Sequence, residues 1–147
     1  MDHLDEKILD ALRENSALSK RKIAKSTGLP LTTVFHRIKK MEKEGIIKKY
    51  TIEVDPEKLG LGICAYILVS IQQSSPDGQK YSQKEIATYI KKMFANVESV
   101  AIVTGDIDMI IKARFKSIKE LNSFLTAKLR NVDGVARTVT SVVLEEV

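Results

Sequence analysis

The chain has 147 residues and a net charge of +5, and its content of 44% hydrophobic and 29% charged residues is typical of a folded globular protein, not of a disordered one. No apolar run reaches the length of about 18 residues that a membrane-spanning helix needs, and the charged N-terminus is unlike a secretory signal peptide. The single cysteine, Cys64, cannot form an internal disulfide, so we expect a cytoplasmic protein that does not contact membranes.

The positive charge is confined to the first third of the chain. Residues 1–50 hold twelve Lys or Arg and seven Asp or Glu, whereas residues 51–147 hold twelve of each kind. A cationic segment joined to a neutral one indicates a polyanionic partner for the cationic part. A solvated basic surface would carry the same charge, so the helical pattern of this segment has to decide between the two.

Three short amphipathic helices are predicted in the cationic segment, over about residues 4–15, 20–27 and 31–43. Asp2 and Ser19 are suited to cap the first two, because their side-chain oxygens can accept hydrogen bonds from the free N–H groups of a first helical turn. Apolar residues recur on one face of each helix, and these are Leu4, Ile8, Leu9, Leu12, Ile23, Ala24, Val34, Ile38 and Met41.

A tight connection joins the second and third helices. Gly28 allows a sharp turn, and Pro30 suits the entrance to the third helix, because a first helical turn has no use for its missing N–H. Two short helices joined in this way predict a winged-helix-like helix-turn-helix DNA-binding domain over residues 1–45.

In this motif the N-terminal half of the second helix of the pair contacts base edges, while flanking cations contact phosphates. We therefore expect base contacts from Thr32, Thr33, Phe35 and His36, with a thymine methyl group packed on Phe35 or on a threonine. The phosphate contacts are expected from Lys20, Arg21, Lys22, Lys39 and Lys40. Arg37 has two interpretations, a phosphate contact or an ion pair that holds the third helix to its own domain.

Residues 46–62 are predicted to link this domain to a second one. Tyr50, Ile52 and Val54 alternate with polar residues, which is the two-residue period of a strand, and Asp55-Pro56 then breaks the pattern. We expect a hinge that contains a linker strand.

The rest of the chain, residues 63–147, shows a β-α-β pattern twice. Strands are expected over 63–71, 97–104, 107–115 and 135–147. The motifs Ser82-x-x-Glu85 and Ser117-x-x-Glu120 are capping boxes that open two helices. The inward-facing helical residues are expected to be Ile86, Ile90, Met93, Ile118, Leu121, Leu125 and Leu129. The predicted fold class is therefore α+β, with a ferredoxin-like βαββαβ sandwich in this C-terminal domain.

The sheet of this sandwich is expected to carry apolar residues on both faces. The two helices cover one face, and residues such as Ile110 and Val142 remain for the other. A sheet of that kind needs a further partner, and a second copy of the chain is the simplest one. A homodimer would present two recognition helices about one DNA turn, or a multiple of it, apart.

The chain resembles the Lrp/AsnC family of bacterial and archaeal transcription regulators over almost all of its length. The matching motifs are Asp2-x2-Asp5-x2-Ile8-Leu9, Ile23-Ala24, Gly28-Leu29, Val34-x2-Arg37-Ile38-x2-Met41-Glu42-x2-Gly45-Ile46-Ile47, Asp55-Pro56-x2-Leu59-Gly60, Thr104-Gly105-Asp106-x-Asp108 and Gly134-Val135-x-Arg137-Thr138-x-Thr140-Ser141. Two features depart from the family pattern, namely Pro30 in place of a capping serine and a long loop from Gln72 to Tyr81. With Pro30 there, the cap of the third helix would fall to Thr32 or Thr33, or be lost.

The resemblance implies a sequence-specific regulator that binds pseudo-palindromic promoter sites in double-stranded DNA. It also implies homodimers that can assemble into tetramers or octamers, and a small effector, often an amino acid, bound by the C-terminal domain. The residues implied as effector contacts are Gly105, Asp106, Asp108, Thr138, Thr140 and Ser141. The same residues would also serve as ordinary turn and strand residues, so both interpretations stay open.

The sequence gives little sign of an enzyme. The only histidines, His3 and His36, have no metal-ligand neighbour at useful spacing, and no phosphate-binding glycine loop is present, so we expect no metal site, cofactor or catalytic residue. Two alternatives remain, a DNA-coating architectural protein and, by resemblance, a siroheme-decarboxylase-like enzyme. In the second case Lys112 and Arg114 would face the anionic tetrapyrrole.

Overall fold

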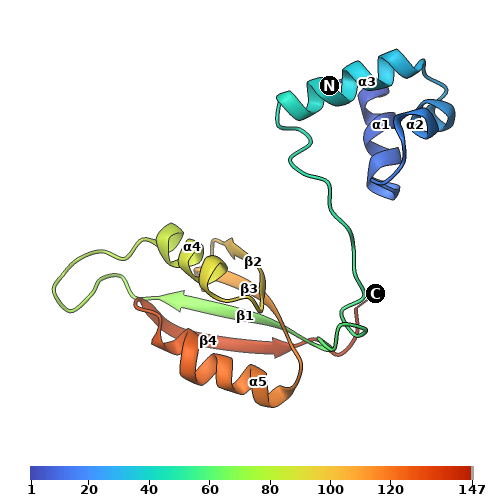
Figure 1. Ribbon diagram of the computed structural model, residues 1–147. Coiled ribbons are helices and arrows are strands. Elements are labelled where there is room, and N and C mark those ends of the chain that lie inside the picture. The colour runs from blue at the N-terminus through green and yellow to red at the C-terminus, as the bar shows by residue number, and fades with distance from the viewer. Residues whose placement is uncertain (147) are drawn as a thin grey trace. The chain divides into compact units, whose positions relative to one another are not determined.

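The computed structural model describes residues 1–146 and divides the chain into two compact units, with the boundary between Val54 and Asp55 (Figure 1). The boundary falls inside the linker predicted over residues 46–62. No helix in the described part of the chain is both long enough and apolar enough to cross a membrane.

The N-terminal unit consists of three helices, α1 (His3–Glu14), α2 (Lys20–Thr27) and α3 (Leu31–Lys43). The predicted caps of α1 and α2 are confirmed. The Asp2 carboxylate accepts hydrogen bonds from the backbone N–H groups of Leu4 and Asp5, and the Asp5 carboxylate accepts one from the N–H of Asp2. Ser19 caps α2 through the N–H of Lys22. Gly28 ends α2 with a φ of 70°, a conformation that glycine adopts at little cost.

Helix α3 begins without a side-chain cap. Pro30 lies at its N-cap position and offers no acceptor, and neither Thr32 nor Thr33 takes over the role, so the cap is lost. Contacts with α1 and α2 hold the helix instead. Its buried residues Val34, Ile38 and Met41 pack against Ile8 and Ile23, and these five side chains form the core of the unit.

The prediction of a strand between Tyr50 and Val54 is wrong. Residues 48–54 belong to no helix or strand, because a strand needs a neighbour and the described chain supplies none there. The segment is instead held to the helices. The N–H of Ile47 donates to the carbonyl of Met41, and the Tyr50 hydroxyl donates to the Glu42 carboxylate at 2.7 Å.

The C-terminal unit is a four-stranded antiparallel sheet with helices, as predicted (Figure 1). In chain order its elements are β1 (Ile63–Ile71), α4 (Gln83–Met93), β2 (Val97–Ile102), β3 (Met109–Phe115), α5 (Ile118–Ser123) and β4 (Val135–Val142). Helix α5 continues through a π-helical turn, Phe124–Lys128, and a 3-10 turn, Leu129–Asn131. The strand order β2-β3-β1-β4 is that of a ferredoxin-like sandwich.

Alternate strand residues face the helices and form the larger core. Ala65, Ile67 and Val69 of β1 lie there with four residues of β3, packed against buried residues that include Ile86, Ile90, Leu121, Phe124 and Leu129. Two helical expectations were wrong. Ile118 is 57% exposed and Met93 is 60% exposed. Each continues the apolar period of its helix, but each lies at an end of that helix, where the side chain no longer packs against the core.

The second sheet face is apolar in part, but not through Val142. Val142 pairs with Ala65, and paired residues in neighbouring strands share a face, so Val142 lies on the helical side. Leu68 lies between Ile110 and Val139 on the other side, next to Tyr66. We refer to these four residues as the open sheet face.

Candidate nucleic-acid interface and effector site

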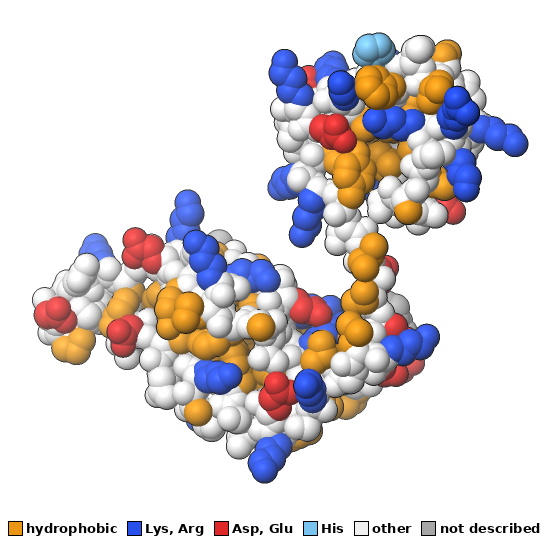
Figure 2. Space-filling view, in the orientation of Figure 1, with side chains coloured by type: hydrophobic (Ala, Val, Ile, Leu, Met, Phe, Trp, Pro, Cys, Tyr) orange, Lys and Arg blue, Asp and Glu red, His pale blue; other side chains and the backbone are white. Residues whose placement is uncertain are grey.

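The exposed surface of α3 lies opposite its buried stripe. At 100° per residue, Thr32, His36 and Lys39 project away from the core, and all three are exposed. Phe35 lies on one flank of this surface, and Thr33 and Arg37 lie on the other. Of the remaining predicted contacts, Arg21, Lys22 and Lys40 are exposed, whereas Lys20 and Thr33 are half-buried. Figure 2 shows how the lysine and arginine side chains spread over this unit.

Phe35 brings two of the predicted phosphate contacts together. The ammonium group of Lys20 lies 4.3 Å from the centre of its ring, and that of Lys39 lies 4.9 Å from it. The ring is 36% exposed and meets His36 edge to face, with 5.8 Å between the ring centres. Cation–π attraction therefore organises cations from α2 and α3 around one aromatic side chain.

Arg37 forms the ion pair that one of its two interpretations anticipated. Its Nη1 donates to the carboxylates of Asp2 and Asp5, each at 2.7 Å, and Asp5 is only 6% exposed. The hydrogen bond from Arg37 lowers the pKa of Asp2 to about 2, and the pKa of Asp5 is lowered by the N–H of Asp2 and then by Arg37. The charge of Arg37 is matched inside the unit, and its phosphate contact stays a prediction.

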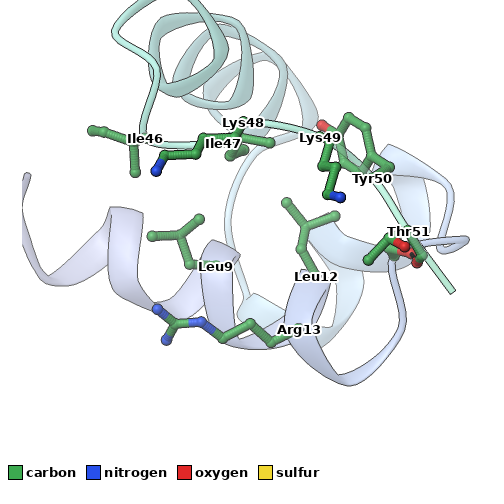
Figure 3. A pocket seen from close by; sticks show the side chains of 10 residues that line it. Leu9, Leu12, Arg13, Ile46, Ile47, Lys48, Lys49, Tyr50 and Thr51 are labelled. Atoms are coloured by element: carbon green, nitrogen blue, oxygen red, sulfur yellow. Dashed lines mark hydrogen bonds between the residues drawn. The ribbon is translucent and has the colours of Figure 1, made fainter. Parts of the chain in front are cut away.

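A hollow of about 490 Å³ lies between α1 and residues 46–51 (Figure 3). Leu9 and Leu12 of α1 point toward Ile47 and Tyr50 across it, with Arg13 at the rim. Partial burial, and then the hydrogen bond to Glu42, raise the pKa of the Tyr50 hydroxyl to about 12. The lining combines apolar side chains with the cationic residues Arg13, Lys48 and Lys49.

In the C-terminal unit, the predicted effector residues after β2 have unequal roles. Asp106 is exposed at the turn that Gly105 opens with a φ of 115°. The Asp108 carboxylate accepts hydrogen bonds from the N–H of Ile71 at 2.7 Å and from the Gln83 side chain at 2.6 Å. Asp108 thus ties the turn to the end of β1 and to the start of α4, and sequence reasoning missed this role.

The predicted effector residues of β4 do not converge. Thr138 pairs with Val69 and Thr140 with Ile67, so both lie on the helical side, whereas Ser141 pairs with Tyr66 on the other side. Thr138 lies at the sheet end that Asp108 occupies, since the N–H of Asp108 donates to the carbonyl of Val69. The structure therefore groups Gly105, Asp106, Asp108 and Thr138 at one sheet end.

Two family models match the chain. Residues 1–48 match a winged helix-turn-helix DNA-binding model, and residues 64–147 match the Lrp/AsnC ligand-binding domain. The chain belongs to the Lrp/AsnC family. The HTH-type transcriptional regulator FL11 of Pyrococcus furiosus is 38% identical over 145 residues, which cover 99% of this chain and 90% of that protein. The chain is accordingly a DNA-binding transcription regulator with a ligand-binding domain.

Solved Lrp/AsnC structures share the whole fold. A transcriptional regulator from Neisseria meningitidis, solved as its complex with L-methionine, is 28% identical, with a TM-score of 0.89 over 100% of this chain and 92% of that one. AsnC of Escherichia coli is 28% identical, with a TM-score of 0.81 over 99% of this chain and 93% of that one.

Four charged residues of this Lrp/AsnC protein gather beside the open sheet face. Lys112 and Arg114 of β3 form ion pairs with Glu98 of β2 and with Glu146, and the bonds from both cations lower the pKa of Glu146 to about 2. The cations considered for an anionic tetrapyrrole are therefore already matched by carboxylates. Among residues 1–146, no group of His, Cys, Asp and Glu is arranged to hold a metal ion.

Proposed function

We propose that the chain acts as a homodimer that recognises specific promoter DNA through α3. Binding of a small effector raises or lowers the affinity of the dimer for that DNA. One observation carries the proposal. A cationic helix-turn-helix unit exposes Thr32, His36 and Lys39 along the side of α3 that faces away from its own core. We expect no catalytic activity, in keeping with the family and with the exposed surface of α3.

On the DNA, Thr32 and His36 occupy the middle of the exposed surface and contact base edges. Phe35, on its flank, packs against a thymine methyl group, while Lys20 and Lys39 beside its ring contact phosphates. Thr33, Arg21, Lys22 and Lys40 complete the proposed contacts. Arg37 acts chiefly from inside the protein, because its ion pairs fix α3 against the start of α1.

The open sheet face supports the homodimer. Tyr66 is 39% exposed and Val139 is 44% exposed, with Leu68 and Ile110 half-buried between them. A second copy that covers this face buries these side chains, and its symmetry supplies two α3 helices to the two halves of a pseudo-palindromic site, about ten base pairs or a multiple of that apart. Larger assemblies, tetramers or octamers, would use other surfaces.

The effector is proposed to be an amino acid bound at the sheet end that holds Gly105, Asp106 and Thr138. The Neisseria relative was solved with L-methionine, which supports this class of ligand for a family member. The exposed carboxylate of Asp106 suits an ammonium group. Asp108 contributes less directly, since both its oxygens already accept hydrogen bonds.

Selection of genomic fragments by the full-length protein tests the function, followed by affinity measurements on the selected and on random duplexes over a salt series. We expect the selected duplex to bind at least about a thousandfold more tightly than random DNA. His36→Ala should reduce that preference. Lys39→Gln should weaken binding to both duplexes, and Lys119→Gln on α5 is the matched charge control. Equal affinity for both duplexes would identify a DNA-coating protein and refute the proposal.

A further inference from the structure

A hollow of about 340 Å³ opens beside β4 at its first residues. Its lining comprises Arg130, Val135, Ala136, Arg137 and Thr138. We call it the arginine hollow. It lies at the end of the sheet that holds Thr138 and, across β1, the Asp108 turn, but Arg130 and Arg137 belong to no contact proposed so far.

The two arginines are unlike the third arginine of this unit. Arg114 is bound to the carboxylates of Glu98 and Glu146. Within residues 1–146, neither Arg130 nor Arg137 has a carboxylate within ion-pair distance, and both are exposed. Two arginine side chains line one small hollow, and an anion bound there would be attracted by both positive charges.

The backbone beneath the two arginines is firmly held. Arg130 lies in the 3-10 turn Leu129–Asn131, whose Leu129 is fully buried, and Arg137 pairs with Ser70 across the sheet. The connection between them passes through Gly134, with a φ of 88°. A Cβ at that position would lie 2.6 Å from Cδ1 of Ile86, so the turn is packed directly against α4. The backbone positions from which the two arginine side chains extend are therefore set by the fold.

Other donors complete the set. Thr138, which carries a hydroxyl group, also lines the hollow. Strand β4 has β1 as its one neighbour in the described sheet, so every second backbone N–H along its outer edge is free for a ligand. Guanidinium forks, a hydroxyl and free N–H groups are together the donor set that recognises carboxylate and phosphate oxygens.

We infer that the arginine hollow binds a small oxyanion, either the carboxylate of an amino acid or a phosphate group. Its volume suits a ligand of that size. If the oxyanion is the carboxylate of the effector, a link that rests on the proposed function, Arg130 and Arg137 hold one end of the ligand.

Isothermal titration calorimetry on the full-length protein tests the inference. The probes are the twenty L-amino acids in turn, the amide of any that binds, and inorganic phosphate, each up to about 10 mM so that a millimolar Kd is detected. We expect one amino acid or phosphate to bind. Arg130→Gln and Arg137→Gln should each weaken that binding by about tenfold, the usual effect of losing one charge-assisted hydrogen bond.

Lys119→Gln removes the same charge from α5 and should leave the binding unchanged. Arg137→Lys keeps the charge but loses the fork, and an intermediate loss is expected. An amino acid that binds while its amide does not identifies the carboxylate, and binding by phosphate alone identifies the phosphate group. Thermal melts of the variants should match wild type, since both side chains are exposed.

The inference is overturned if no amino acid and no phosphate binds to the wild-type protein. It is also overturned if both glutamine variants bind as wild type does. DNA affinity without added anion separates this result from the proposed function. The glutamine variants should bind DNA like wild type, and a wild-type protein that ignores DNA would refute the regulator while leaving the calorimetric result to decide the hollow.

Discussion

The two units of the chain differ in the size of their hydrophobic cores and therefore in their expected stability. The N-terminal unit buries five hydrophobic side chains, whereas fourteen residues form the core of the C-terminal unit. A unit of about fifty residues buries a smaller share of its surface and is only marginally stable alone. The unit that must expose a helix to DNA is therefore the weaker one.

The two units also manage charge differently. The N-terminal unit leaves most of its cations exposed and matches Arg37 with Asp2 and Asp5 where α3 meets α1. The C-terminal unit pairs Lys112 and Arg114 with two glutamates on its sheet. In both units ion pairs of little-exposed arginines fix the architecture, and mainly exposed cations mark the surfaces that we propose to meet a ligand.

The largest effect is expected from Ile38→Ala, which should cost about 2–5 kcal/mol through the cavity that it leaves. In the thin N-terminal core that loss should unfold the unit and abolish DNA binding. Calorimetry of the full-length protein should lose its first melting transition and keep the second. Ile67→Ala, also fully buried, is the matched change in the larger core and should lower the second transition instead. A single transition that shifts in both variants would show that the two units unfold together, and it would contradict the difference in stability that we expect between them.

The sequence predicted most of this architecture because its signals are local. Caps at Asp2 and Ser19, the turn at Gly28 and the apolar period of each element depend on neighbours within a few residues. The face predicted for Val142 was wrong because it depends on the register between β4 and β1. The other predictions that were wrong depend on where distant elements end. Ile118 and Met93 continue the apolar period of their helices, but they lie at helix ends that are not packed against the core. Residues 50–54 have the periodicity of a strand but no partner strand.

The candidate sites were predicted less completely, for a similar reason. Arg37 had two interpretations because its choice depends on carboxylates about thirty residues away. The clamp that Asp108 forms with Ile71 and Gln83 has no sequence signal at all. Thr138 and Ser141 lie on opposite sheet faces because side chains alternate along a strand. The sequence alone could therefore have predicted that the two residues do not share a site.

The next effect concerns the open sheet face, where only the C-terminal unit should respond. Leu68→Asp places a carboxylate amid apolar side chains that a second copy is proposed to cover. Burial of an unpaired charge is costly, so we expect the dimer to dissociate at micromolar concentration. Light scattering measures the mass. Thr88→Asp on the exposed side of α4 introduces the same charge and should leave the mass unchanged. A dimer that persists in Leu68→Asp would place the interface elsewhere.

A smaller effect distinguishes two carboxylates of one turn. Asp108→Ala should cost about 1–3 kcal/mol in the C-terminal unit, because the N–H of Ile71 loses its acceptor. Asp106→Ala should leave stability within about 0.5 kcal/mol of wild type, because Asp106 is exposed. Chemical denaturation monitored by circular dichroism measures both. Equal losses would show that the turn is not held through Asp108.

The smallest effect is a response to acid that each unit should show separately. Asp2 and Glu146 both have a pKa lowered to about 2, Asp2 by Arg37 and Glu146 by Lys112 and Arg114. A depressed pKa means that the unfolded chain binds more protons, so each contribution is complete above about pH 5 and is lost as the pH falls toward 2. Both melting transitions should therefore move down over that interval.

Two variants assign each loss to its unit. Arg37→Gln removes the partner of Asp2 and Asp5 and should flatten the acid response of the first transition alone. Glu146→Gln should flatten that of the second transition alone. Because Asp2 and Glu146 are exposed, the shifts should be modest and should shrink in high salt. An Arg37→Gln protein whose first transition still falls as steeply as wild type would mean that other carboxylates govern acid unfolding of the DNA-binding unit.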